Sequence, residues 1–101
     1  MQTLFQQLAE NMQLIYRKAI DADNALDALQ KEGKGKFATI FDDNQGFTVS
    51  SKRFLPYVEE TALEIAALSE ADEATVKQNL PTVVKKMEAL LATLGQFKQS
   101  L

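Results

Sequence analysis

The sequence predicts a mainly α-helical fold, an antiparallel bundle of three to four helices with a small β-hairpin inserted between the first and second helices. Three observations favour it. Apolar residues recur in steps of three and four along two long segments, this period disappears between residues 35 and 51, and turn-forming or capping residues separate the segments. At 101 residues the chain is expected to form one domain, residues 1–101, large enough to bury a core of its own.

The first helix is expected over about residues 3–32. Its apolar residues have the a/d spacing of a helix that packs along its whole length: Phe5, Leu8, Met12, Ile15, Ala19, Ala22, Leu26 and Leu29. Lys31 lies in the last turn, where the helix dipole favours cations, and Gly33 follows as a helix stop. A helix of this length spans roughly 45 Å, so its apolar stripe has to be covered either by later helices or by a second copy of the chain.

The hairpin is expected over about residues 36–50. Residues 37–41 and 47–49 are rich in aromatic and β-branched side chains, and the Asp/Asn/Gly segment 42–46 between them is typical of a turn. A two-stranded hairpin is only marginally stable alone, so it is expected to lean on the helices. Its phenylalanines, Phe41 and Phe47 among them, then either close one end of the core or form an exposed contact patch.

A second helix is expected over about residues 54–69, with Ser50 or Ser51 as its cap and Pro56 near the start of its regular part. Residues 72–99 carry the second long apolar stripe. Pro81 lies inside this stripe and the apolar phase continues through it, so the segment is expected to form either one kinked helix or two helices.

The charges of the last two helices are complementary. Residues 54–73 contain six acidic residues and no Lys or Arg, whereas residues 74–101 contain four lysines and one acid. Opposite charge favours the pairing of these segments as antiparallel neighbours, although each exposed ion pair contributes only about 0 to 1 kcal/mol. Overall the chain is acidic, with a net charge of -3, which argues against a nucleic-acid partner.

The residue types exclude several kinds of reactive site. The chain has no histidine, cysteine or tryptophan, so disulfides, thiolate ligands and structural zinc are excluded, and no cofactor is expected. Glu60 and Glu64 lie one helical turn apart, but without histidine a solvated acidic face is favoured over a metal site. The turn beginning at Asp42 does not match a calcium loop, because its twelfth position is Arg53.

Two basic segments are also given structural interpretations. Residues 33–36 alternate Gly and Lys but follow a helix, whereas a phosphate-binding loop precedes one, so they are interpreted as a helix stop. Tyr16 beside Arg17, and Tyr57 near Arg53, resemble pairs that stack on nucleic-acid bases, but neither pair belongs to a more extended basic stripe.

No segment reaches the roughly 18 apolar residues of a membrane span and the N-terminal sequence does not resemble a signal peptide, so the protein is expected to be cytoplasmic.

The function expected from these features is a non-catalytic protein–protein interaction or adaptor module that forms a homodimer or contacts a protein client. The candidate interface residues are Phe5, Leu8, Met12, Ile15, Ala19, Ala22, Phe41 and Phe47. The small residues Ala19 and Ala22 suit either a close helix crossing in a dimer or a bulky neighbour in the monomer core. Two alternatives stay open, a small-molecule binder with or without enzymatic activity and, third, a nucleic-acid-associated regulator.

Overall fold

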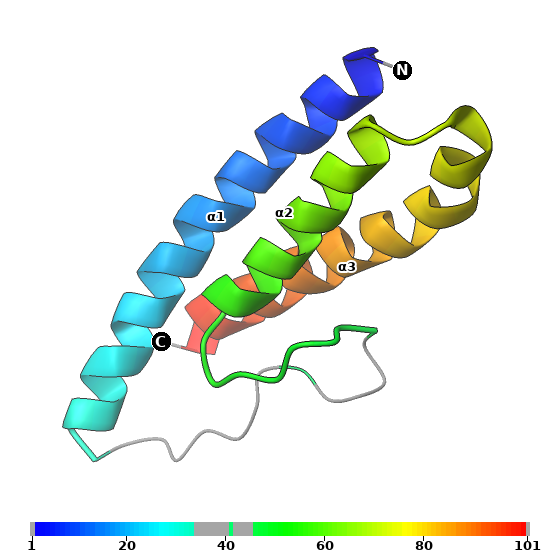
Figure 1. The fold of residues 1–101 in the computed structure, drawn as a ribbon. Helices are drawn as coiled ribbons and strands as arrows, with labels where there is room; N and C mark the ends of the chain where they lie inside the picture. The colour runs from blue at the N-terminus through cyan, green and yellow to red at the C-terminus, as the bar shows by residue number, and fades with distance from the viewer. Residues whose placement is uncertain (1, 34–40, 42–45, 101) are drawn as a thin grey trace.

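Three helices form the protein in a computed structural model that describes residues 2–33, 41 and 46–100. They are α1 (Gln2–Lys31), α2 (Leu55–Ser69) and α3 (Glu73–Ser100). Figure 1 shows α2 running opposite to α1 and α3 running back again, and each helix packs against both of the others. The mainly helical prediction is confirmed, with three helices, and each helix begins and ends within one residue of its expected bounds.

The apolar stripe of α1 is covered by the other two helices of the same chain. Leu8, Met12, Ala22 and Leu26 are buried, and Ile15 and Ala19 are fully buried. The molecule measures 49 × 25 × 18 Å, so α1 sets its long dimension. The helix ends at Lys31, and Gly33 adopts a φ of 71°, the left-handed conformation that a glycine helix stop provides.

The start of α2 is capped from α1. The buried carboxylate of Asp23 accepts hydrogen bonds from the backbone N–H groups of Phe54 (2.7 Å) and Leu55 (3.1 Å), and the N-cap residue, Phe54, makes no side-chain capping hydrogen bond. The expectation that Ser50 or Ser51 caps α2 is therefore wrong; the Ser51 hydroxyl instead accepts a hydrogen bond from the Arg53 N–H. A buried carboxylate is well suited to this position, because the N-terminus of a helix carries a partial positive charge.

Residues 73–100 form one helix, which settles the choice left open by Pro81. Asp72 caps its start by accepting a hydrogen bond from the Thr75 N–H at 2.8 Å. The hydrogen bonds from Thr75 hold the pKa of Asp72 below its ordinary value, against a smaller opposing effect of burial. Pro81 lies in the third turn at an exposed position, where water can hydrogen-bond the backbone carbonyl that the proline leaves without an N–H partner.

The predicted β-hairpin is not supported. The part of the chain that the structure describes contains no strand, and Phe47, Thr48 and Val49 form irregular backbone, while residues 36–40 and 42–45 lie outside the described residues. The N–H groups of Thr48 and Val49 are bound by the Glu60 carboxylate of α2 rather than by a second strand. A lone hairpin is marginal in stability, and here hydrogen bonds to a helix replace its ladder.

The length and apolar content of the helices also bear on membrane insertion. No helix among the described residues is both long enough and apolar enough to cross a bilayer.

Candidate functional site

The most unusual polar feature of the molecule is a buried lysine between two glutamates. The Lys86 Nζ atom of α3 donates to Glu60 Oε2 at 3.0 Å and also to Glu64 Oε1, both on α2. The side chain of Lys86 is 6% exposed, that of Glu60 10% and that of Glu64 33%. The charge complementarity of the two segments is therefore realised inside the molecule, and the interpretation of Glu60 and Glu64 as a solvated face is wrong.

Glu60 also holds the loop that precedes α2. Its Oε1 atom accepts hydrogen bonds from the N–H groups of Thr48 and Val49, each at 2.9 Å, and from the Thr48 hydroxyl. Burial raises the pKa of Glu60, but the hydrogen bonds from Thr48, Lys86 and Val49 outweigh it, so the net pKa lies below the ordinary 4.5. Burial lowers the pKa of Lys86, but Glu64 and Glu60 outweigh it, so the net pKa lies above 10.5.

An aromatic cluster completes this region. The rings of Phe41, Phe47 and Tyr57 lie with their centroids 4.8 to 5.0 Å apart, and the Lys86 Nζ atom lies 5.5 Å from the centre of the Phe47 ring. The Tyr57 hydroxyl accepts from the Ser51 N–H (2.8 Å) and donates to the Ser51 carbonyl (3.0 Å). The Tyr57 hydroxyl and the Lys86 ammonium group both have hydrogen-bond partners within the protein. Such an arrangement fixes the loop against the helices and indicates a structural role.

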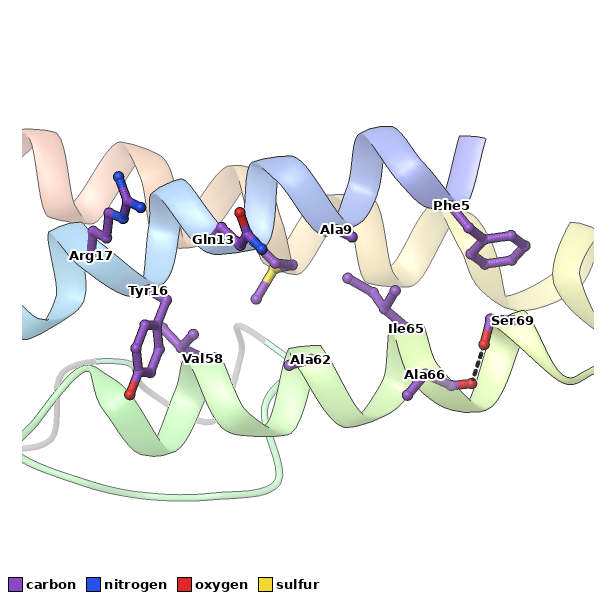
Figure 2. Close-up of a pocket in the computed structure, with 11 residues that line it drawn as sticks. Phe5, Ala9, Gln13, Tyr16, Arg17, Val58, Ala62, Ile65, Ala66 and Ser69 are labelled. Atoms are coloured by element: carbon purple, nitrogen blue, oxygen red, sulfur yellow. Dashed lines mark hydrogen bonds between the residues drawn. The ribbon is translucent and has the colours of Figure 1, made fainter. Parts of the chain in front are cut away.

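An apolar groove of about 600 Å³ lies between α1 and α2. Figure 2 shows Phe5 and Ser69 at one end of it and Tyr16 and Val58 at the other. Its lining residues are Phe5, Ala9, Met12, Gln13, Tyr16, Arg17, Val58, Ala62, Ile65, Ala66 and Ser69. Arg17 is the only charged residue among them, and Figure 2 shows its side chain directed away from α2.

Beside this groove lies the outer face of α2, which comprises Ala62, Leu63, Ala66 and Ala67. These are four of the six exposed residues of α2, whereas the exposed residues of α1 and α3 are mostly polar or charged. Leu63 is 71% exposed, the highest value among the exposed large apolar side chains of the described residues. A contiguous apolar face on a surface helix is normally covered by another element, so this face has the composition of an interface.

A second, smaller groove of about 220 Å³ lies on the other flank of α1, against α3. It is lined by Lys18, Asp21, Ala22, Leu94, Gly95, Phe97 and Lys98. Ala22 and Leu94 are buried, and a methyl group added at Gly95 would meet no atom within 4 Å. The groove is thus an apolar hollow with lysines at its rim.

The structure distributes the eight candidate interface residues between the core and its edge. Leu8, Met12, Ile15, Ala19, Ala22 and Phe41 are buried in the core of the single chain. Phe5 and Phe47 are partly buried, and Phe5 also lines the α1–α2 groove. Met12 borders the α1–α2 groove and Ala22 the α1–α3 groove, so a partner could touch these two at a groove floor, and Phe5 is accessible from the α1–α2 groove.

The two basic–aromatic pairs have different surroundings in the fold. Tyr57 is fully buried, and the Arg53 Nε atom donates to Asp27 at 2.8 Å. Tyr16 is 47% exposed and lines the α1–α2 groove with Arg17. Among the described residues no three Asp or Glu side chains gather as a metal site would require.

Sequence reasoning missed Leu63 and the outer face of α2. The signal was present in the composition, because α2 carries only three charged residues, all acidic. Sequence reasoning also missed the pairing of Lys86 with Glu60, for which only the overall charge complementarity gave a signal. No protein-family model, curated protein or solved structure matches the chain, so its function has to be inferred from its own surfaces.

Proposed function

We propose that the protein is a non-catalytic protein–protein interaction module that self-associates through the outer face of α2. The observation that carries this proposal is the exposure of Leu63 within a run of exposed alanines on a helix with few charges. Covering a leucine side chain contributes about 1.5 to 3 kcal/mol, and the neighbouring Ala62 and Ala66 allow another element to approach closely. A client protein with a complementary apolar surface would use the same face.

The charges support a protein partner rather than a reactive centre. Glu60 and Glu64 both pair with Lys86, with one negative charge in excess, and Glu59 is the most exposed of the three charged residues of α2. A surface depleted in charge at its centre is typical of the core of a protein interface.

The test is to place a charge on this face. Leu63→Lys is expected to abolish self-association while leaving the helix content unchanged, because Leu63 contributes little to the core. Ala28→Lys, a lysine added at an exposed position of α1, is the matched control and should associate like the parent. Molar masses from size-exclusion chromatography with light scattering compare the three proteins; equal masses for the parent and Leu63→Lys would contradict the proposal.

The α1–α2 groove favours a second candidate function, the binding of a small apolar molecule. Its volume of about 600 Å³ lies in the usual range of ligand pockets, and Gln13 and Arg17 provide polar groups at its edge. Native mass spectrometry of the purified protein tests this function. A retained ligand that is lost in Ala62→Phe, a variant that narrows the groove, would support it, and mass equal to that of the bare chain would contradict it.

A further inference from the structure

We infer that Leu63 of one copy binds in the α1–α3 groove of a second copy, so that the copies join head to tail. This inference rests on the proposed function and specifies the partner surface that the outer face of α2 contacts. It joins two features that lie on different sides of the molecule, an exposed apolar side chain and an apolar hollow.

Leu63 has the properties of an inserting residue. It is 71% exposed, and its neighbours one helical turn away are Glu59 and Ala67. Ala66, three residues further along, is also exposed. The exposed residues one turn after Leu63, Ala66 and Ala67, have short side chains. They therefore do not prevent Leu63 from entering a hollow on another surface.

The α1–α3 groove has the properties of a receiving site. Its floor contains Ala22 and Leu94, and the space above Gly95 is open. The volume of about 220 Å³ exceeds the roughly 150 Å³ of an apolar cavity that accepts benzene, so a leucine side chain fits within it.

Apolar residues continue beyond the groove along the same flank. Leu14 lies one turn before Lys18 on α1 and is 50% exposed, and Leu91 lies one turn before Gly95 on α3 and is 38% exposed. With Leu63 and Tyr16, these are the four exposed large apolar residues of the described chain. Leu63 lies on the inserting side, Leu14 and Leu91 lie on the receiving side, and Tyr16 lines the α1–α2 groove.

The charges favour the same pairing. Lys18 and Lys98 lie at the rim of the α1–α3 groove, together with Asp21, and Glu59 lies one turn from Leu63. Insertion of Leu63 therefore brings an acidic residue toward a rim with two lysines and one acid. Such complementarity sets the orientation of the contact more than its strength.

A symmetric contact between two α2 helices is disfavoured by the same charges. The exposed acids Glu59 and Glu70 lie on either side of Leu63 in the sequence, and residues 54–73 contain no Lys or Arg, so two such surfaces would bring acids together without a base. In a contact between two different surfaces, copies join in a row. The copy at one end of the row has a free Leu63, and the copy at the other end has a free groove. The assembly then grows with concentration or closes into a ring, rather than stopping at a two-fold dimer.

The decisive experiment mixes two variants that each lack one side of the contact. Leu63→Lys removes the inserting side chain and keeps the groove, whereas Gly95→Leu fills the groove and keeps Leu63. Gly95→Leu should fold, because a side chain there meets open space and leucine favours the helix more than glycine does. Ala74→Leu, at an exposed position of α3, is the matched control for the added leucine.

Each variant alone is expected to associate at least about thirtyfold more weakly than the parent, as for removal of a central interface residue. Their equimolar mixture is expected to form a one-to-one complex that does not grow further, measured by sedimentation velocity with one variant fluorescently labelled. Unchanged association of Gly95→Leu, or failure of the mixture to form the complex, would overturn the inference while leaving the proposed function intact. A parent that stays monomeric would overturn both.

Discussion

At the scale of single residues, Lys86 joins α3 to α2 through a buried ion-pair triad. Its ammonium group is almost fully removed from water and pairs with Glu60 and Glu64. Such a triad is stabilising only while all its members are present, because a buried carboxylate without a partner pays a large desolvation penalty.

Replacement of Lys86 by methionine keeps the length and apolar stem of the side chain but removes its charge. Lys86→Met is expected to lower the free energy of unfolding by about 3 to 5 kcal/mol, because Glu60 and Glu64 lose their cation. Urea denaturation followed by circular dichroism measures the change. Lys85→Met, at the exposed neighbouring position, is the control and should change stability by no more than about 0.5 kcal/mol; an equally small change for Lys86→Met would refute the role of the triad.

The shifted pKa values of Glu60 and Lys86 predict how stability depends on pH. The pKa of Glu60 is lower in the folded protein, so its contribution is present above about 4.5 and is lost as pH falls through the folded value. The pKa of Lys86 is higher, so its contribution is complete below about 10.5 and is lost as pH rises through the folded value. Unfolding free energies measured from neutral to acidic pH should fall less steeply for Glu60→Gln than for the parent; parallel curves would contradict this assignment.

The residue scale is also where the sequence was least informative. It indicated that residues 54–73 and 74–101 carry opposite charges, but not that Lys86 rather than Lys85 would be buried. Which lysine turns inward depends on the helix phase relative to α2, and this phase becomes known only when the helices are packed. Asp23 illustrates the same limit, since its partners lie 31 and 32 residues away.

At the scale of elements, the helices were predictable because their apolar periods are long and nearly unbroken. The apolar stripes of α1 and α3 each continue over many turns. Gly33 marks the end of α1 by its left-handed backbone conformation, and Asp72 marks the start of α3 by capping a backbone N–H group, and both effects are local in the sequence. The loop before α2 was not predictable in this way. Phe47, Thr48 and Val49 have a strand-like composition, but their partners are Tyr57, Glu60 and Lys86 of the helices.

The capping of α2 by α1 gives a prediction at this scale. Asp23→Ala is expected to lower the free energy of unfolding by about 1 to 3 kcal/mol, because two backbone N–H groups lose their acceptor. The same unfolding assay measures it, with faster amide hydrogen exchange at Phe54 and Leu55 as a local readout. Asp27→Ala, one turn further along α1, removes only an exposed ion pair with Arg53 and should cost about 0 to 1 kcal/mol. Equal effects of the two variants would contradict the capping role.

At the scale of the whole molecule, the sequence predicted an apolar stripe on α1 that something must cover, and the structure covers it with α2 and α3. The most exposed large apolar side chain of the described residues lies instead on α2, where Leu63 is not among the buried residues. Periodicity identifies which residues pack along a helix, but it does not distinguish packing within a chain from packing between chains. That distinction required the exposed fractions of individual side chains, which come only from the folded molecule.

Self-association through the outer face of α2 is measured most simply by the molar mass of the parent chain as a function of concentration. Light scattering over roughly a hundredfold range is expected to give masses that rise above the 11.2 kDa of a single chain, with Leu63→Lys remaining at that value throughout. A parent mass that stays at 11.2 kDa over the whole range would show that the α2 face does not join copies of this chain.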